Sequence, residues 1–239
     1  MKRLSSLLLV IVMISMLFLT SCSGVESDGL FIYKLNEETN SYEISIIQYP
    51  IMWAEMIPVM YNGNDVTKIS DGGFAGYRQL QSVNIPGTIK EIGTYAFGSC
   101  TNLGDVSFEE GLEIIDDYAF ANCSSLQVVC LPSSITELGI CSFGGCTSLQ
   151  AIFYMGTRDE WNALAKENGW YEGSDALYEC RVYFCEGYVE DKQDTIDMWN
   201  TYVIEKILYT HAAIPLPSVT LDKSGNETFH DIPTPEKPE

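Results

Sequence analysis

The sequence predicts a repeat solenoid in which a parallel strand ladder is built from four copies of one 23-residue unit. Two apolar residue types recur at a constant step of 23 along the chain: Phe74, Phe97, Phe120 and Phe143, and Leu80, Leu103, Leu126 and Leu149. A single unit of this size cannot bury its apolar face alone, so neighbouring units stack and share one continuous core. The four copies occupy residues 66–157.

The charge of the chain limits its partners. The 239 residues carry 33 acidic side chains against 13 basic ones, for a formal net charge of −20. Binding to nucleic acid or to anionic lipid headgroups requires clusters of Lys and Arg, and the sequence contains none. The acidity is typical of a soluble surface protein, and a cationic partner is the less favoured interpretation.

Residues 1–22 have the pattern of a secretory signal. Lys2 and Arg3 precede an apolar run from Leu7 to Leu19, which is too short to favour a transmembrane helix. The final four residues, Leu19-Thr20-Ser21-Cys22, resemble the lipobox of bacterial lipoproteins. This resemblance implies lipidation of Cys22 and an extracytoplasmic, membrane-anchored location at the bacterial cell surface. An uncleaved anchor helix is the alternative.

Two segments precede the repeats. Residues 23–29 read as a short tether. Residues 30–65 predict an N-terminal cap that begins with a hairpin, because apolar and polar residues alternate on both sides of the turn sequence Asn36-Glu37-Glu38-Thr39-Asn40. The apolar segment 51–60 is expected in the core of this cap, with an exposed adhesive surface as the alternative.

Within each repeat, apolar residues two apart predict a short strand, as in Val83 and Ile85. Proline follows the strand in two of the copies. Short helical turns are expected at AFGSC, AFANC and SFGGC, with the preceding Tyr-Ala-Phe segment packed on the back wall of the solenoid.

The repeat resembles the BspA-like class of bacterial leucine-rich repeats, whose units follow the pattern IGxxAFxxCxxLxxVxIP. The second copy matches this pattern at Ile92-Gly93, Ala96-Phe97, Cys100, Leu103, Val106 and Phe108, and the third at Ala119-Phe120, Cys123, Leu126, Val129 and Leu131-Pro132. The resemblance implies a leucine-rich-repeat fold, and for some members adhesion or contact with host proteins.

Beyond the repeats, residues 158–190 predict a C-terminal cap. Thr157 and Glu160 form a capping box that opens a helix extending to about Glu167, and Leu177 to Phe184 reads as a closing strand. Residues 191–213 predict a second helix, either docked on the solenoid or partner-binding. The proline-rich, acidic residues 214–239 predict a disordered tail.

The sequence contains no motif that indicates catalysis, a cofactor or a metal. Cys100, Cys123 and Cys146 recur at one repeat position, which predicts a buried ladder of small side chains rather than a reactive site. No C-x-x-C pair occurs, and no histidine lies beside a candidate nucleophile. We therefore expect a binding protein and not an enzyme.

The outward positions of the strand ladder are the candidate binding site. They change from polar to apolar along the solenoid: Ser82, Asn84, Asp105, Ser107, Val128, Cys130, Ala151, Phe153 and Met155. An exposed apolar surface beside a polar one favours a protein partner. The alternatives are an envelope scaffold and a module that binds an extracellular glycan. C-terminal residues that cover Phe153 and Met155 would remove the apolar part of this surface.

Overall fold

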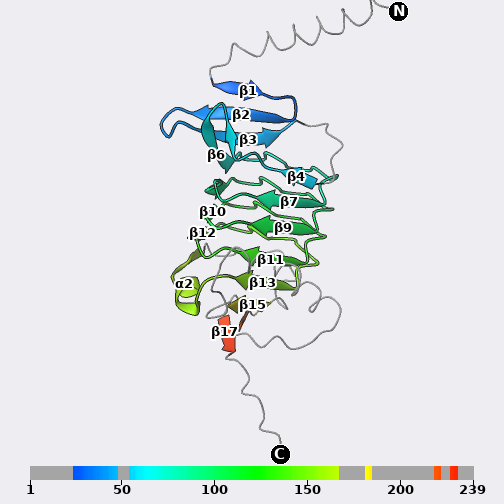
Figure 1. Ribbon diagram of the computed structural model, residues 1–239. Coiled ribbons are helices and arrows are strands. Elements are labelled where there is room, and N and C mark those ends of the chain that lie inside the picture. Colours follow the sequence, from blue (N-terminus) through cyan, green and yellow to red (C-terminus); the bar gives the residue numbers. More distant parts are fainter. Residues whose placement is uncertain (1–23, 48–53, 167–180, 185–217, 222–226, 231–239) are drawn as a thin grey trace, which may run out of the picture.

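The protein is a β-solenoid, seen in a computed structural model that describes residues 24–47, 54–166, 181–184, 218–221 and 227–230 (Figure 1). Its coils are stacked in sequence order, so the N-terminal strands lie at one end of the molecule and the C-terminal strands at the other. The predicted solenoid with parallel strands is confirmed. The helix expected over 191–213 lies outside the described residues.

The N-terminal strands extend one sheet before the first repeat. β2 (Phe31–Asn36) and β3 (Ser41–Ile46) form the predicted antiparallel hairpin, and β3 pairs in parallel with β6 (Asn64–Ile69). β1 (Val25–Ser27) pairs with β2, so the prediction of a tether over 23–29 is wrong at these residues. The role of the hairpin as a cap stays a prediction.

The same sheet continues through each repeat by two-residue strands. After β6 these parallel strands are β8 (Glu91–Ile92), β10 (Ile114–Ile115), β12 (Glu137–Leu138) and β14 (Ala165–Lys166). A further short strand, β5 (Met60–Tyr61), pairs antiparallel with β6. Ile92, Ile115 and Leu138 hold equivalent places in this ladder and are fully buried. The second apolar segment of each repeat therefore enters the core as expected.

The longer strands of the repeats form a second ladder, which is divided in two. β4 (Ala54–Met56), β7 (Ser82–Ile85) and β9 (Asp105–Phe108) make a three-stranded parallel sheet. The five-stranded sheet beyond it comprises β11 (Val128–Leu131), β13 (Ala151–Tyr154), β15 (Arg181–Phe184), β16 (Ser218–Leu221) and β17 (Glu227–His230). The register within each sheet keeps equivalent repeat positions side by side.

The C-terminal elements agree with the prediction only in part. α2 (Arg158–Ala163) begins at the predicted capping box of Thr157 and Glu160, and ends before the expected Glu167. β15 lies within the predicted closing strand. The prediction of a disordered tail over 214–239 is wrong at β16 and β17, which add antiparallel strands to β15.

The segments expected as helical turns are instead tight turns that contain residues with left-handed backbone. Two positions in each copy have positive φ: Gly72, Tyr95, Tyr118 and Cys141 at the first, and Gly76, Ser99, Asn122 and Gly145 at the second. A right-handed helix cannot continue through such residues. Alternate backbone amides of these turns donate to the next coil, as from Phe97 to the carbonyl of Ala119 at 2.7 Å and from Phe120 to that of Ser142 at 2.8 Å. The amides between them bond within the turn, as from Gly98 to the carbonyl of Tyr95 at 3.0 Å.

The core is a column of stacked aromatic rings along the solenoid axis. Ring centroids of Phe74, Phe97, Phe120 and Phe143 follow one another at 4.9, 5.1 and 5.4 Å, and the last two pairs lie within 7° of parallel. The sulfhydryl groups of Cys100, Cys123 and Cys146 line the same core, and each donates to the carbonyl oxygen of a phenylalanine in the preceding coil, at 3.1 to 3.2 Å. The constant step of 23 residues thus produces two interior ladders.

Candidate functional site

The candidate site lies on the second ladder, where the outward positions of β7 and β9 form one half and those of β11 and β13 form the other. No strand pairing joins these neighbouring halves, because β9 and β11 belong to different sheets. Their side chains also differ in accessibility. We call the outward residues of β7 and β9, namely Ser82, Asn84, Asp105 and Ser107, the polar half.

The polar half is open to solvent. Asn84 and Asp105 are exposed, and Ser82 and Ser107 are half-buried. Parallel pairing places Ser82 beside Asp105 and Asn84 beside Ser107. Side chains that are equivalent in sequence therefore form adjacent pairs on a single surface, as predicted.

A chain of hydrogen bonds fixes the side chains of the polar half. The Ser107 hydroxyl donates to Oδ1 of Asn84 at 2.7 Å, and Nδ2 of Asn84 donates to Oε1 of Glu109 at 3.1 Å. Glu109 in turn accepts a bond from the backbone amide of Gly87 at 3.0 Å. The Asn84 amide is thus held in one orientation before any partner binds.

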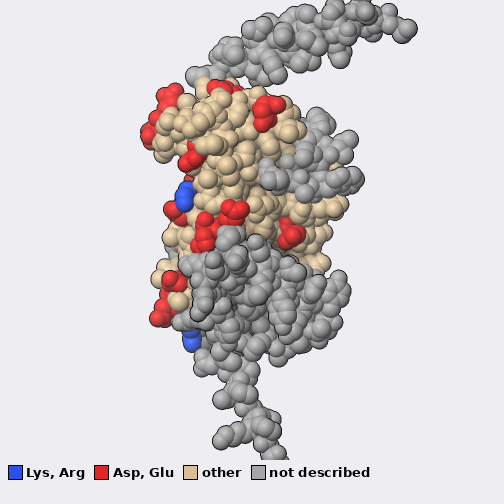
Figure 2. Space-filling model, viewed as in Figure 1, with Lys and Arg blue, Asp and Glu red and all other residues tan. Residues whose placement is uncertain are grey.

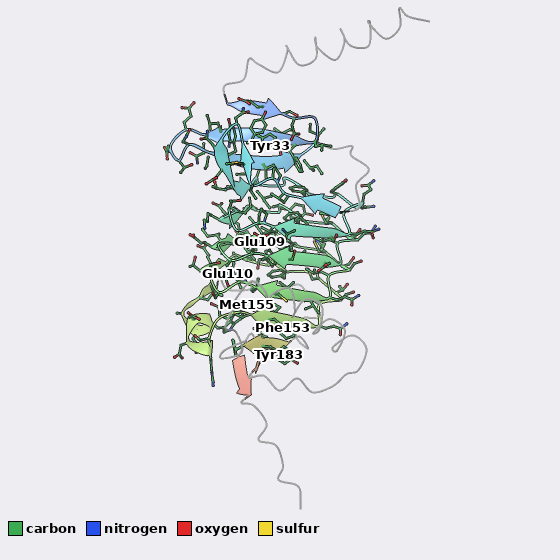
Figure 3. All side chains as sticks on the ribbon, in the orientation of Figure 1. Tyr33, Glu109, Glu110, Phe153, Met155 and Tyr183 are labelled. Atoms are coloured by element: carbon green, nitrogen blue, oxygen red, sulfur yellow. The ribbon has the colours of Figure 1, made fainter. Side chains whose placement is uncertain are left out.

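Sequence analysis did not single out Glu109 as part of this site. It comes directly after the last residue of β9, and Figure 3 shows it at the end of that strand. The sequence could have indicated this role, because Glu109 directly follows a strand with outward polar residues and its long side chain can reach the neighbouring coil.

Asp105 provides the charge of the polar half. Desolvation by the surrounding side chains raises the pKa of its carboxyl above the ordinary value of 3.8. The local charge is therefore sensitive to what packs against it, and a cationic group of a partner would favour the ionised form.

The other half of the predicted site is buried, which corrects the expectation of an exposed apolar surface. Val128, Cys130, Ala151, Phe153 and Met155 are each at most 7% exposed. Phe153 stacks on Tyr183 of β15 with ring centroids 5.0 Å apart and planes 13° from parallel (Figure 3). The outward residues of β11 and β13 therefore belong to the core. The contact with Tyr183 agrees with the alternative that C-terminal residues cover Phe153, and Met155 is buried as well.

The prediction from the sequence was wrong for two aromatic residues, which are exposed. Tyr95 and Tyr118 are 36% and 43% exposed, although the Tyr-Ala-Phe segment was expected to pack on the back wall. Both have φ of 56°, and this left-handed backbone turns their side chains outward while the next two residues remain buried. The glycine at this position in the first copy was the available signal, because glycine favours left-handed backbone.

The interior thiols are poorly suited to chemistry. Burial raises the pKa of Cys100 and of Cys146 to about 12, and raises that of Cys123 further. Thiolates are the reactive form of cysteine, so these groups are inert at neutral pH. Among the described residues, no group of three His, Cys, Asp or Glu side chains is arranged to hold a metal ion.

Carboxylates predominate among the charged side chains of the surface. Figure 2 shows acidic side chains spread over the visible face, with few basic ones between them. Within the described segments, no helix reaches the length and apolarity needed to cross a bilayer. Cys22, the predicted lipidation site, lies outside those segments.

Comparison with protein families identifies the repeat. Residues 61–165 match the BspA type leucine-rich repeat region, in six copies. This span includes the four copies recognised from the 23-residue step and extends beyond them at both ends. The repeat region of this chain therefore belongs to the BspA type of leucine-rich repeats.

Solved structures with similar folds come from bacteria. The pneumococcal vaccine antigen PcpA is 17% identical, with 70% of this chain and 51% of that chain covered and a TM-score of 0.50. The leucine-rich repeat protein TpLRR of T. pallidum is 26% identical, with 54% and 70% covered and a TM-score of 0.45. One from Bacteroides capillosus is 22% identical, with 56% and 100% covered and a TM-score of 0.49. No curated protein matches the chain.

Proposed function

We propose that this protein is a lipid-anchored surface protein of a bacterium that binds a protein partner through the polar half of the second ladder. The observation that carries the proposal is the pairing of four outward side chains across β7 and β9, with Asn84 and Asp105 exposed. The family of the repeat and the fold shared with a pneumococcal vaccine antigen support a role in protein binding or adhesion.

The polar half has the properties of a recognition surface that supplies specificity. The Asn84 amide is oriented by Ser107 and Glu109, which lowers the entropy lost when a partner binds. Asp105 adds a carboxylate that pairs with a donor or a cation on the partner. Because the surface lacks large apolar side chains, its partner contributes the apolar anchors or binds weakly.

The lipid anchor at Cys22 orients the solenoid. β1 begins at Val25, and three residues of extended chain span at most about 11 Å. A lipid on Cys22 therefore holds the N-terminal strands close to the membrane, while successive repeats project away from it. Cys22→Ala should release the protein from membranes into the medium, and membrane retention of that variant would contradict lipidation.

Partner capture tests the binding surface. Residues 23–239 carrying Asn84→Arg and Asp105→Arg should lose the partner that the unchanged domain captures, with an unchanged circular dichroism spectrum. Thr136→Arg, on the exposed start of the other ladder, is the matched control and should capture normally. Equal capture by the double variant would refute the proposed surface.

The alternative function is a scaffold that contacts other components of the bacterial envelope. The same capture experiment separates the two: a scaffold recovers proteins of the bacterium's own envelope, whereas an adhesin recovers proteins of its surroundings.

A further inference from the structure

A polar groove lies at the junction of the N-terminal hairpin and the first repeat, away from the polar half of the second ladder. Its volume is about 500 Å³, within the range of small-molecule sites. Its walls are the hairpin tip between β2 and β3, the turn between β5 and β6, and the outward side of β6 and β8. The groove combines segments that are far apart in the sequence.

Hydrogen bonds hold the two turns of the groove together. Nδ2 of Asn40 donates to Oδ1 of Asn64 at 3.0 Å, which joins the hairpin tip to the start of β6. Beneath them, the Thr67 hydroxyl donates to the Ser41 hydroxyl at 2.8 Å. Asn40 has φ of 53°, so the hairpin tip adopts a left-handed conformation. The groove is therefore formed before a ligand enters.

The chemistry of the lining selects the class of ligand. All twelve lining residues are polar, charged or glycine, so the groove offers a hydrophobic ligand only the aliphatic carbons of these side chains and no large apolar side chain. Carboxylates at Glu43, Asp65 and Glu91 outnumber the ammonium groups of Lys68 and Lys90, which disfavours a phosphate or other anion. The Lys68 and Glu91 side chains are already paired at 2.5 Å.

Donors and acceptors remain available for a ligand. Among the described residues, the Nδ2 groups of Asn36 and Asn64 donate to no protein group, whereas the Lys90 ammonium already donates to the carbonyl of Gly111 at 3.0 Å and is paired with Glu113. A ligand whose own groups both donate and accept fits such a lining, and the hydroxyls of a sugar have this property. We infer that this groove binds a neutral saccharide, at a site separate from the surface proposed for the protein partner.

Affinity should be weak, because no aromatic ring lines the groove to stack on a sugar face. The test uses a panel of neutral trisaccharides (maltotriose, cellotriose, mannotriose and chitotriose) at millimolar concentration, with residues 23–239 labelled with ¹⁵N. At least one should shift the side-chain amide signals of Asn36, Asn40 and Asn64. Inorganic phosphate should shift none of them.

Variants locate the binding. Asn64→Ala removes a donor and the bond that joins the two turns, so it should weaken saccharide binding about tenfold or more. Asn36→Asp retains the shape of the groove but replaces a donor by an acceptor and should weaken it similarly. Asn84→Ala, on the ladder face, is the control and should leave saccharide binding unchanged.

Three results would overturn the inference: no response to any trisaccharide, undiminished saccharide binding by both Asn64→Ala and Asn36→Asp, or binding of phosphate in the groove. None of these bears on partner capture, which depends on Asn84 and Asp105. Loss of capture with intact saccharide binding, or the reverse, distinguishes failure of one proposal from failure of the other.

Discussion

One repeat position is exposed to solvent at the N-terminal end of the second ladder and buried at its C-terminal end. Asn84, Ser107, Cys130 and Phe153 are equivalent by the 23-residue step, and their side chains pass from exposed through half-buried to fully buried. The same backbone position thus serves as surface near the N-terminus and as core near the C-terminus. Strand pairing does not account for the difference, because β7 is paired on both sides with β4 and β9, just as β13 is with β11 and β15. The outward side chains differ instead: those of β7 and β9 are polar and open to solvent, whereas Phe153 of β13 is apolar and stacks on Tyr183.

Introducing a charge at this position should give the largest contrast. Phe153→Asp replaces a buried ring, which stacks on Tyr183, by an unpaired carboxylate and should destabilise the fold by about 4 kcal/mol or more. Asn84→Lys introduces a charge at the equivalent exposed position, beside the Glu109 carboxylate, and should cost less than about 1 kcal/mol. Urea denaturation measures both, and similar costs would show that the two ends do not differ.

The interior should be uniform where the outer face is not. Phe97→Ala and Phe143→Ala each remove a fully buried, stacked ring and should each cost about 3–5 kcal/mol. Thermal or urea unfolding measures these values. A much smaller cost for one of them would mean that the aromatic column is packed well at only one end of the solenoid.

Glu110 links the two halves where the strand ladder is broken. Its carboxylate accepts bonds from the backbone amides of Ser133 and Ser134, at 3.1 and 3.2 Å, and from the Ser133 hydroxyl. Glu110→Ala should lower the free energy of unfolding by about 1.5–3 kcal/mol, since several bonds to a charged group are lost. Glu113→Ala, on an exposed side chain of the next strand region, is the control. An equal effect of both would contradict a special role for Glu110.

The smallest effect concerns the pH dependence of the polar half. The pKa of Asp105 is raised in the folded state, so its protonated form favours folding and that contribution is lost as pH rises above 3.8 through the raised value. Asp105→Asn should therefore increase Tm relative to the unchanged protein more at pH 7 than at pH 3. A difference that is independent of pH would show that Asp105 is fully solvated.

The sequence predicted the repeat well because every coil repeats the same physical requirement. Phe, Leu and Cys at fixed positions must fill an interior of constant width, and a mismatch in one copy would disturb both neighbours. The capping box of α2 was equally local, since both partners lie within four residues. Such features depend only on residues that are close together or repeated at a fixed spacing, so the sequence alone is enough to predict them.

The errors arose where the environment of a residue depends on distant segments. Phe153 alternates with Ile152 and Tyr154 as an outward residue should, yet it is fully buried and stacks on Tyr183, thirty residues further along the chain. The segments AFGSC, AFANC and SFGGC were expected as helical turns, but Ser99, Asn122 and Gly145 within them have positive φ, which is rare outside glycine and asparagine and which local sequence does not reveal. The groove beside Asn64 joins turns whose contact no local pattern records.

The most direct test of partner binding by the polar half is photocrosslinking from within the candidate site. A photoreactive phenylalanine analogue at position 84, on the exposed face of β7, should crosslink to the captured partner, whereas the same analogue at position 136, on the other ladder, should not. Crosslinking from position 136 alone, or equally from both positions, would contradict the assignment of partner binding to the polar half.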